Sequence, residues 1–483
     1  MAVQDQIHDL TAIEQRDALR RGELRSRELV AHYLERIRTH GEAVGAFVEV
    51  TGERALAAAE RLDAAGITVD PARPILGLPF ADKDLVARAG VPTRYGSRLM
   101  AANVPEVSDP LVDVLDGAGG VSLGKTATPE FGSPAYTEPL AGVPARSPWD
   151  LARGAGGSSG GAAAAVAAGL LPFAPGSDGG GSIRIPAAAC GIVGLKPSRG
   201  RVPSAGGFDF PGGLVTAGSL ARTVADAALL LDAMAPAGAP AAWATRPPGD
   251  GPFLAAATEP EAARPMRIGV TTVSPWSSWY DITVSEEARA ALDAAIAELL
   301  ALGHEVEEVD WRPAPEYPDH FRVIWQAGPA SLPIPEEAVG LLEPLTAWLR
   351  GEGRARHVGE LAAAIGWLAG FERDTIAAFS RFDAVLTPTL AVPPPLVGHY
   401  DAADGERNFE QQCQVTPWTS FANATGLPAL QLPVHWTEAR DDRPALPMGV
   451  QFVGRPGGEA TLLALGAQLE SVLHWDRRRP PVW

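Results

Sequence analysis

Two serines in glycine-rich segments are the residues of this chain best suited to nucleophilic chemistry. Ser158 lies within GGSSGG at 156–161 and Ser182 follows three consecutive glycines, with an alanine-rich apolar run between them that suits a short buried helix. Glycine adopts positive φ angles and lets a ligand approach the backbone, so two such loops around one helix indicate a built site. Two tight turns on a small-residue scaffold would explain either loop alone. Lys83, in a short apolar run upstream, favours the functional interpretation.

A serine hydroxyl is a poor nucleophile until a base accepts its proton. None of the nine histidines lies between Lys83 and the two serine loops. Lysine with its ordinary pKa is neutral only about once in 2,500 at pH 7, but burial away from a carboxylate lowers that pKa by up to roughly 3–5 units. On an extended backbone the neighbouring Asp82 and Asp84 would point away from a site that Lys83 faces. A neutral Lys83 would then accept a proton from Ser158, and Ser158 one from Ser182.

The segment around Ser182 also suits the stabilisation of an oxyanion. Gly179, Gly180, Gly181 and Ser182 offer consecutive backbone amides, the arrangement that holds a carbonyl oxygen as its carbon becomes tetrahedral. Asp178 and Arg184 flank the four residues, and we expect them to brace the loop through hydrogen bonds.

These motifs resemble those of the amidase signature family. GGSSGG is followed by SDGGGSIRIPA at 177–187 and CGIVGLKPS at 190–198, and Ser158 and Ser182 are separated by 182 − 158 = 24 residues, which agrees with the family spacing. The resemblance extends to GKTATPEFG at 124–132 and TSFANATGLPALQLPV at 419–434, so it covers nearly the whole chain. Two positions depart from the commonest pattern: Ala162 replaces a frequent third serine, and Gly179 replaces a threonine or larger residue.

The resemblance implies an amidase that uses a Ser-cisSer-Lys triad and no cofactor or metal. Ser182 would form the acyl-enzyme, Ser158 would be the family's cis-serine and pass a proton to the leaving amine, and Lys83 would be the base. The oxyanion hole would be formed by Gly179, Gly180, Gly181 and Ser182. Ser159, Asp178 and Arg184 would support the site.

The expected fold is a single α/β domain over residues 1–483, with a large mixed β-sheet covered by helices on both faces. Thr11 opens a capping box at the start of one expected helix, and Ser26 is placed to cap a second. Ser285 is placed to cap a third helix over 285–302. The expected parts are a mostly helical segment at 1–70, a catalytic core at 75–235, a Pro/Gly/Ala-rich surface excursion at 236–265 and a substrate-pocket half at 266–483. Further strands are expected at 267–270, 306–311, 384–388 and 429–434.

Bulk composition limits the partners of this protein. The net charge of −18 and pI near 5.0 argue against binding to nucleic acid, which requires a basic face. Two cysteines exclude a disulfide scaffold and fit a reducing, cytoplasmic compartment. The sequence shows neither an apolar leader nor a membrane-spanning run. The resemblance to the amidase signature family implies a small-molecule amide as the partner, and a homodimer is left open.

Several other functions are considered. GGSSG also matches the G-x-S-x-G nucleophile elbow, but residues 150–155 do not read as the apolar strand that an elbow requires. His304 begins an H-E-x-x-H-like segment that lacks the second histidine and is expected to be a solvated edge. Within the resembled family, a glutamine-hydrolysing amidotransferase subunit that needs a partner stays open. In another class, a catalytically silent binding protein stays open too.

The second half of the chain is rich in aromatic residues, which bears on the substrate. Eleven of the twelve tryptophans follow residue 240. Ligand pockets are mostly apolar with a few polar anchors. We therefore expect anilides and aryl or fatty amides, with carbamates and esters of similar shape, to be better substrates than glutamine.

Overall fold

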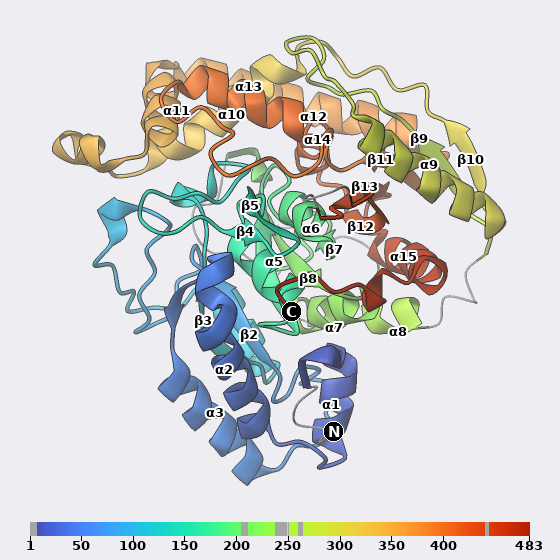
Figure 1. Ribbon diagram of the computed structural model, residues 1–483. Helices are drawn as coiled ribbons and strands as arrows, with labels where there is room; N and C mark the ends of the chain where they lie inside the picture. The colour runs from blue at the N-terminus through green and yellow to red at the C-terminus, as the bar shows by residue number, and fades with distance from the viewer. Residues whose placement is uncertain (1–6, 204–210, 237–248, 250, 259–263, 440–443) are drawn as a thin grey trace.

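An eight-stranded mixed sheet is the largest element of the computed structural model, which describes residues 7–203, 211–236, 249, 251–258, 264–439 and 444–483 (Figure 1). Its strand order is β10-β9-β11-β13-β12-β7-β8-β6. Strand β9 pairs in parallel with β10 and β11, and the other pairs are antiparallel. The strands are β6 Phe173–Asp178, β7 Val193–Lys196, β8 Thr216–Ala221, β9 Arg267–Val270, β10 Glu305–Glu308, β11 Ala384–Pro388, β12 Ala429–Trp436 and β13 Pro447–Gly454.

Helices cover both faces of this sheet. Helix α6 packs on β7, β12 and β13, α7 packs on β8, and α9 and α15 pack on β12 and β13. A further group of helices lies across the top of the molecule as drawn in Figure 1. The sheet-covering helices are α5 Gly160–Ala167, α6 Arg184–Cys190, α7 Val224–Met234, α8 Phe253–Thr258, α9 Glu286–Ala301 and α15 Glu459–Leu473; the upper group is α10 Tyr317–Ser331, α11 Pro344–Ala355, α12 Val358–Phe379, α13 Gly405–Val415 and α14 Ser420–Ala424.

The N-terminal part forms a smaller layer around a three-stranded sheet of order β1-β3-β2. Its elements are α1 Ala12–Arg20, α2 Ser26–Val44, β1 Phe47–Val50, α3 Gly52–Ala65, β2 Pro79–Lys83, α4 Pro110–Gly117 and β3 Val121–Thr126. The hairpin strands β4 Arg146–Ser147 and β5 Asp150–Gly154 follow. Short 3-10 helices span Arg98–Met100, Glu130–Gly132, Pro211–Gly213, Glu336–Leu341 and Trp475–Arg477.

Close backbone approach fixes the start of α5, the helix that follows the first serine loop. A Cβ atom at Gly161 would lie 2.3 Å from the amide nitrogen of Ala127 and 2.5 Å from the carbonyl oxygen of Ala46. Real Cβ atoms do not come that near to backbone, so only glycine allows α5 to lie against the end of β3. This contact places the Ser158 loop beside the end of β2.

Most of the expected elements are confirmed, and some boundaries are corrected. The predicted strands at 267–270 and 384–388 are β9 and β11, and Ser285 caps α9 by accepting a hydrogen bond from the Ala288 amide. Thr11 forms its capping box. Ser26 is not a cap: Arg25 holds that position, and the Ser26 hydroxyl donates to the Gly77 carbonyl at 2.9 Å. The expected strand at 306–311 is β10, which begins and ends earlier.

Two further expectations need revision. Of the expected excursion at 236–265, residues 237–248, 250 and 259–263 lie outside the described residues, but α8 within it packs on α7 and α15 and buries Phe253. The segment that begins at His304 is a solvated edge as expected over Glu305–Glu308, because β10 is an edge strand and both of its end residues are exposed. His304 itself departs from the expectation: it is buried, and its ring nitrogens bond the Met266 amide and the Gln468 side chain.

Candidate active site

The end of β2 brings Lys83 into contact with the first serine loop. Lys83 is 1% exposed, and its Nζ donates to the Ser158 hydroxyl oxygen at 2.8 Å. The same nitrogen lies 3.0 Å from the Ser177 hydroxyl and 3.3 Å from the Ser177 carbonyl oxygen. The peptide bond between Gly157 and Ser158 is cis. Two segments 75 residues apart therefore meet at one buried amine.

Burial lowers the pKa of Lys83 to about 7, with Asp178 opposing the shift. The adjacent carboxylates do not contact the amine, as expected from the extended backbone. Asp82 instead pairs with Arg88 at 2.7 Å, and Asp84 accepts the backbone amide of Arg94 at 3.1 Å. Lys83 is thus close to half neutral near pH 7, which a base requires.

The second serine loop is joined to the first through the backbone. The Ser159 amide donates to the Ser182 carbonyl oxygen at 3.1 Å, and the Ser159 hydroxyl donates to the Ser177 carbonyl at 3.3 Å. Within the part of the chain that the structure describes, the hydroxyls of Ser158 and Ser182 make no direct hydrogen bond to each other. Ser182 is 6% exposed and is one of the residues that line a pocket.

The glycine loop before Ser182 divides its amides between two tasks. The Gly181 amide donates to the Asp178 carboxylate at 2.7 Å, and so does the Ile183 amide at 3.1 Å. Among the described residues, none accepts a hydrogen bond from the amides of Gly179, Gly180 or Ser182. Those three amides remain as donors for a ligand, whereas the Gly181 amide holds the loop itself.

A buried ion pair braces this loop. Asp178 and Arg184 are fully buried and lie 2.9 Å apart. Burial by itself would raise the pKa of Asp178, but the Arg184 guanidinium and the Asn423 amide hold it at about 2. Asn423 donates to the Asp178 carboxylate at 2.9 Å and accepts from Arg184 at 2.7 Å. The Thr419 hydroxyl donates to the Gly180 carbonyl at 2.6 Å.

Several of these contacts involve residues that the sequence did not single out. Ser177 touches Lys83, and its position directly before Asp178 is the only signal for it. Thr419 and Asn423 lie in the TSFANATG segment that carried part of the resemblance, but no individual role followed from it. Gln451, in β13, also bonds Arg184 and had no signal in the sequence.

An aromatic pocket opens beside the glycine loop. Ser182, Gly180 and Ile185 line it together with residues of helices α10 and α13. Its aromatic lining consists of Trp276, Phe321, Trp325 and Phe409, and its other lining residues are Ser133, Ala135, Gln412, Cys413, Thr416 and Ser420. None of these described lining residues is charged. Both cysteines of the chain are buried and unpaired.

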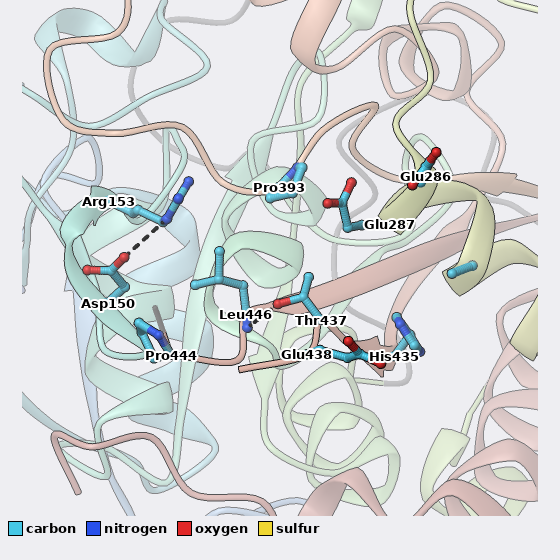
Figure 2. Close-up of a pocket in the computed structure, with 11 residues that line it drawn as sticks. Asp150, Arg153, Glu286, Glu287, Pro393, His435, Thr437, Glu438, Pro444 and Leu446 are labelled. Carbon is cyan, nitrogen blue, oxygen red and sulfur yellow. Dashed lines mark hydrogen bonds and ion pairs between the residues drawn. The ribbon is translucent and has the colours of Figure 1, made fainter. Parts of the chain in front are cut away.

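A second, roomier cavity of about 420 Å³ is unrelated to these residues (Figure 2). Acidic side chains dominate its lining, with an ion pair between Asp150 and Arg153 at 3.1 Å. Strand β5, which begins at Asp150, pairs with β4 in a two-stranded sheet, and its Arg153 forms an isolated bridge with Leu396. Only its last residue, Gly154, is buried. The segment before GGSSGG is therefore not the buried strand that a nucleophile elbow requires.

Comparison with known proteins agrees with this geometry. The model of the family described as Amidase matches residues 28–463. The chain belongs to the amidase signature family. A putative amidase of Synechocystis is 36% identical over 97% of this chain and 90% of that protein. The A subunit of the glutamyl-tRNA(Gln) amidotransferase of Moorella thermoacetica is 34% identical over 98% of this chain and 99% of that protein.

Solved structures of the family share the fold. A 6-aminohexanoate cyclic dimer hydrolase superposes with a TM-score of 0.86 and 30% identity, covering 98% of this chain and 99% of the other. A bacterial aryl acylamidase of the amidase signature family superposes with a TM-score of 0.82 and 25% identity, covering 97% of each chain. The protein is therefore an amidase, a hydrolase of amide carbon–nitrogen bonds. In the described part of this amidase, no helix is long and apolar enough to cross a membrane.

The buried ion pair yields a stability prediction. In Arg184→Leu the charge of Asp178 loses its partner inside the protein, so the free energy of unfolding should fall by about 3–5 kcal/mol. Urea titration followed by tryptophan fluorescence measures it. Arg312→Leu is the matched control, because Arg312 pairs with Asp310 but is 87% exposed, and its change should stay within about 0.5 kcal/mol. Equal effects of the two substitutions would show that the Asp178 pair does not hold the loop.

Proposed function

We propose that this amidase is a serine amidohydrolase that forms an acyl-enzyme on Ser182 and moves protons through Ser158 and Lys83. The observation that carries the proposal is the 2.8 Å contact between the buried Lys83 amine and the Ser158 hydroxyl. No carboxylate among the described residues contacts this amine, so it is free to be neutral and to act as a base.

The reaction would have two stages, acylation of Ser182 and hydrolysis of the acyl-enzyme. Ser158 gives its proton to neutral Lys83 and takes one from Ser182, whose oxygen attacks the amide carbonyl. The amides of Gly179, Gly180 and Ser182 stabilise the oxyanion. The carbon–nitrogen bond then breaks as Ser158 protonates the leaving amine and recovers a proton from Lys83. Water then attacks the acyl carbon and gives a proton to Ser158, which passes its own to Lys83. As the bond between the acyl carbon and the Ser182 oxygen breaks and the acid leaves, the relay returns that proton from Lys83 through Ser158 to Ser182.

The pocket supports an uncharged amide with an aryl or other apolar group as substrate. Trp276, Phe321 and Trp325 present aromatic surface to a ligand held at Ser182. A zwitterion such as glutamine would lose the hydration of two charges against a lining with no opposite charge. Carbamates and esters of the same shape fit the same surface and the same acyl-transfer chemistry. The fold-sharing aryl acylamidase agrees with this choice.

A glutamine-hydrolysing amidotransferase subunit is the second candidate. The observation that favours it is the relative of that name in Moorella thermoacetica, which matches over nearly its whole length. Such a subunit would act on glutamine and need a partner protein. A catalytically silent binding protein is the third candidate, and the intact contact between Lys83 and Ser158 argues against it.

The first functional prediction concerns the nucleophile. A fluorophosphonate probe should label Ser182 covalently, because its oxygen is the group that the relay activates. Mass spectrometry of the labelled protein locates the adduct. Ser182→Ala should lose both the label and amide hydrolysis. Labelling at an unchanged rate in Ser182→Ala would exclude Ser182 as the nucleophile.

The second prediction concerns the base. Because the pKa of Lys83 is about 7 and only the neutral amine accepts a proton, kcat/KM should rise with pH through that value and level off above it. Lys83→Arg keeps a charge that cannot be lost and should abolish activity. A pH profile of kcat/KM measures the rise. A wild-type-like kcat in Lys83→Arg would contradict the relay.

The two neighbouring serines provide an internal control for that relay. Ser158→Ala removes the group that exchanges protons and should lower kcat by about 10³-fold or more, in the range found for other catalytic units that act together. Ser159→Ala removes the two hydrogen bonds between the Ser159 hydroxyl and the Ser177 backbone but no proton-exchanging group, and it should cost much less. The reverse order would place the relay on Ser159.

The third prediction concerns the substrate. Without any partner protein, kcat/KM should be higher for an anilide than for glutamine, since the pocket wall is aromatic and uncharged. Phe321→Ala should lower kcat/KM for the anilide roughly 10–100-fold. Trp279→Ala is the control, because Trp279 is partly exposed and lies outside the pocket lining. A clear preference for glutamine would favour the amidotransferase subunit.

A further inference from the structure

Ser177 contacts the catalytic lysine with two of its oxygens. It is the residue before the end of β6, and Lys83 Nζ lies 3.0 Å from its hydroxyl and 3.3 Å from its carbonyl oxygen. The third neighbour of the amine is the Ser158 hydroxyl at 2.8 Å. These three oxygens are the only hydrogen-bonding partners of the Lys83 side-chain amine among the described residues.

We propose that Ser177 is a positioning residue that holds the Lys83 amine with its free electron pair directed at Ser158. This inference rests on the proposed function, because it concerns the proton relay of that same site. Ser177 would not touch the substrate. It would act only through Lys83.

Donor and acceptor counting supports the proposal. A neutral amine has two hydrogens and one lone pair. A carbonyl oxygen only accepts, so the contact to the Ser177 carbonyl takes one hydrogen. When the second hydrogen goes to the Ser177 hydroxyl, the lone pair is left for the Ser158 O–H. All three directions of the amine are then filled, and Ser158 is the group that gives up its proton.

The position of Ser177 is itself held by the surrounding loops. Its carbonyl oxygen accepts from the Ser159 hydroxyl at 3.3 Å, and its amide donates to that hydroxyl at 3.4 Å. The next residue, Asp178, is fixed by Arg184. Ser177, which contacts the Lys83 amine, and Asp178, which holds the glycine loop, are therefore consecutive residues of β6. This adjacency couples the proposed base to the loop that carries Ser182.

The protonated amine uses the Ser177 hydroxyl differently. An ammonium group donates three hydrogen bonds, one to each oxygen. Hydrogen bonds to a charged group are stronger than those to a neutral one, so loss of the hydroxyl penalises the charged amine more. Ser177→Ala should therefore make Lys83 easier to deprotonate and, at the same time, leave it less well oriented.

The experiment compares pH profiles of kcat for the full-length wild type, Ser177→Ala, Ser177→Thr and Ser219→Ala on one anilide. Ser177→Ala should lower the plateau kcat roughly tenfold and move the acid limb about one pH unit lower. Ser177→Thr keeps the hydroxyl and should restore both. Ser219 is the matched control: it is fully buried in β8, and its hydroxyl bonds only the Ala227 carbonyl, at 2.8 Å, so its loss should leave the limb in place.

The Ser177 variants test the positioning role of Ser177, and Lys83→Met tests the proposed relay separately. An unchanged kcat and acid limb in Ser177→Ala, with Lys83→Met inactive, would overturn the inference alone. A lower kcat with an unmoved limb, or the same limb shift in Ser219→Ala, would also overturn it, since a structural role explains either. Activity in Lys83→Met would overturn the relay itself. If Ser177→Ala does not fold, Ser177→Cys, a weak hydrogen-bonding group of similar shape, should show the same direction of shift.

Discussion

The burial of one amine without a carboxylate partner is the interaction on which this site depends. In water an amine with the ordinary lysine pKa is neutral about once in 2,500 at pH 7. Burial at the end of β2 lowers the pKa of Lys83 to about 7, so the relay that we propose needs no histidine as its base. The cost of burying a polar group is limited because three oxygens of Ser158 and Ser177 surround it.

The carboxylate of Asp178 opposes the lowering of the Lys83 pKa, and its neutralisation is as important as the burial. Asp178 raises the pKa of Lys83, yet its carboxylate is held at 2.9 Å by Arg184 and is shared with Asn423 and two loop amides. The same ion pair thus shapes the glycine loop and removes a carboxylate that would otherwise keep Lys83 charged. The Asp178–Arg184 ion pair therefore bears on both the proposed oxyanion loop and the proposed base.

The order of glycines, serines and lysine predicted the family, the mixed sheet and the contact between Lys83 and Ser158, because short motifs encode loops whose backbone must bend or approach closely. Thr419, Asn423 and Gln451 could not be assigned in the same way. Each contacts Gly180, Asp178 or Arg184 across more than two hundred residues of chain. Such partners depend on how helix α14, which follows Thr419 and contains Asn423, and strand β13, which carries Gln451, dock beside the loop, and not on local pattern. Which loop amides are free to bind a ligand likewise depends on the orientation of the Asp178 side chain, because its carboxylate accepts from the Gly181 and Ile183 amides.

The substrate pocket shows why the chemistry is easier to infer from sequence than specificity is. Its catalytic wall comes from the motif loops, but its aromatic wall comes from α10 and α13, where Phe321, Trp325 and Phe409 occur among many other aromatic residues. Trp276 and Phe321 pack edge to face at 5.5 Å and Phe321 stacks on Trp325 at 5.6 Å, so the wall is a packed cluster with its own stability. A family can therefore vary this wall while the amine, the ion pair and the glycine loop stay unchanged.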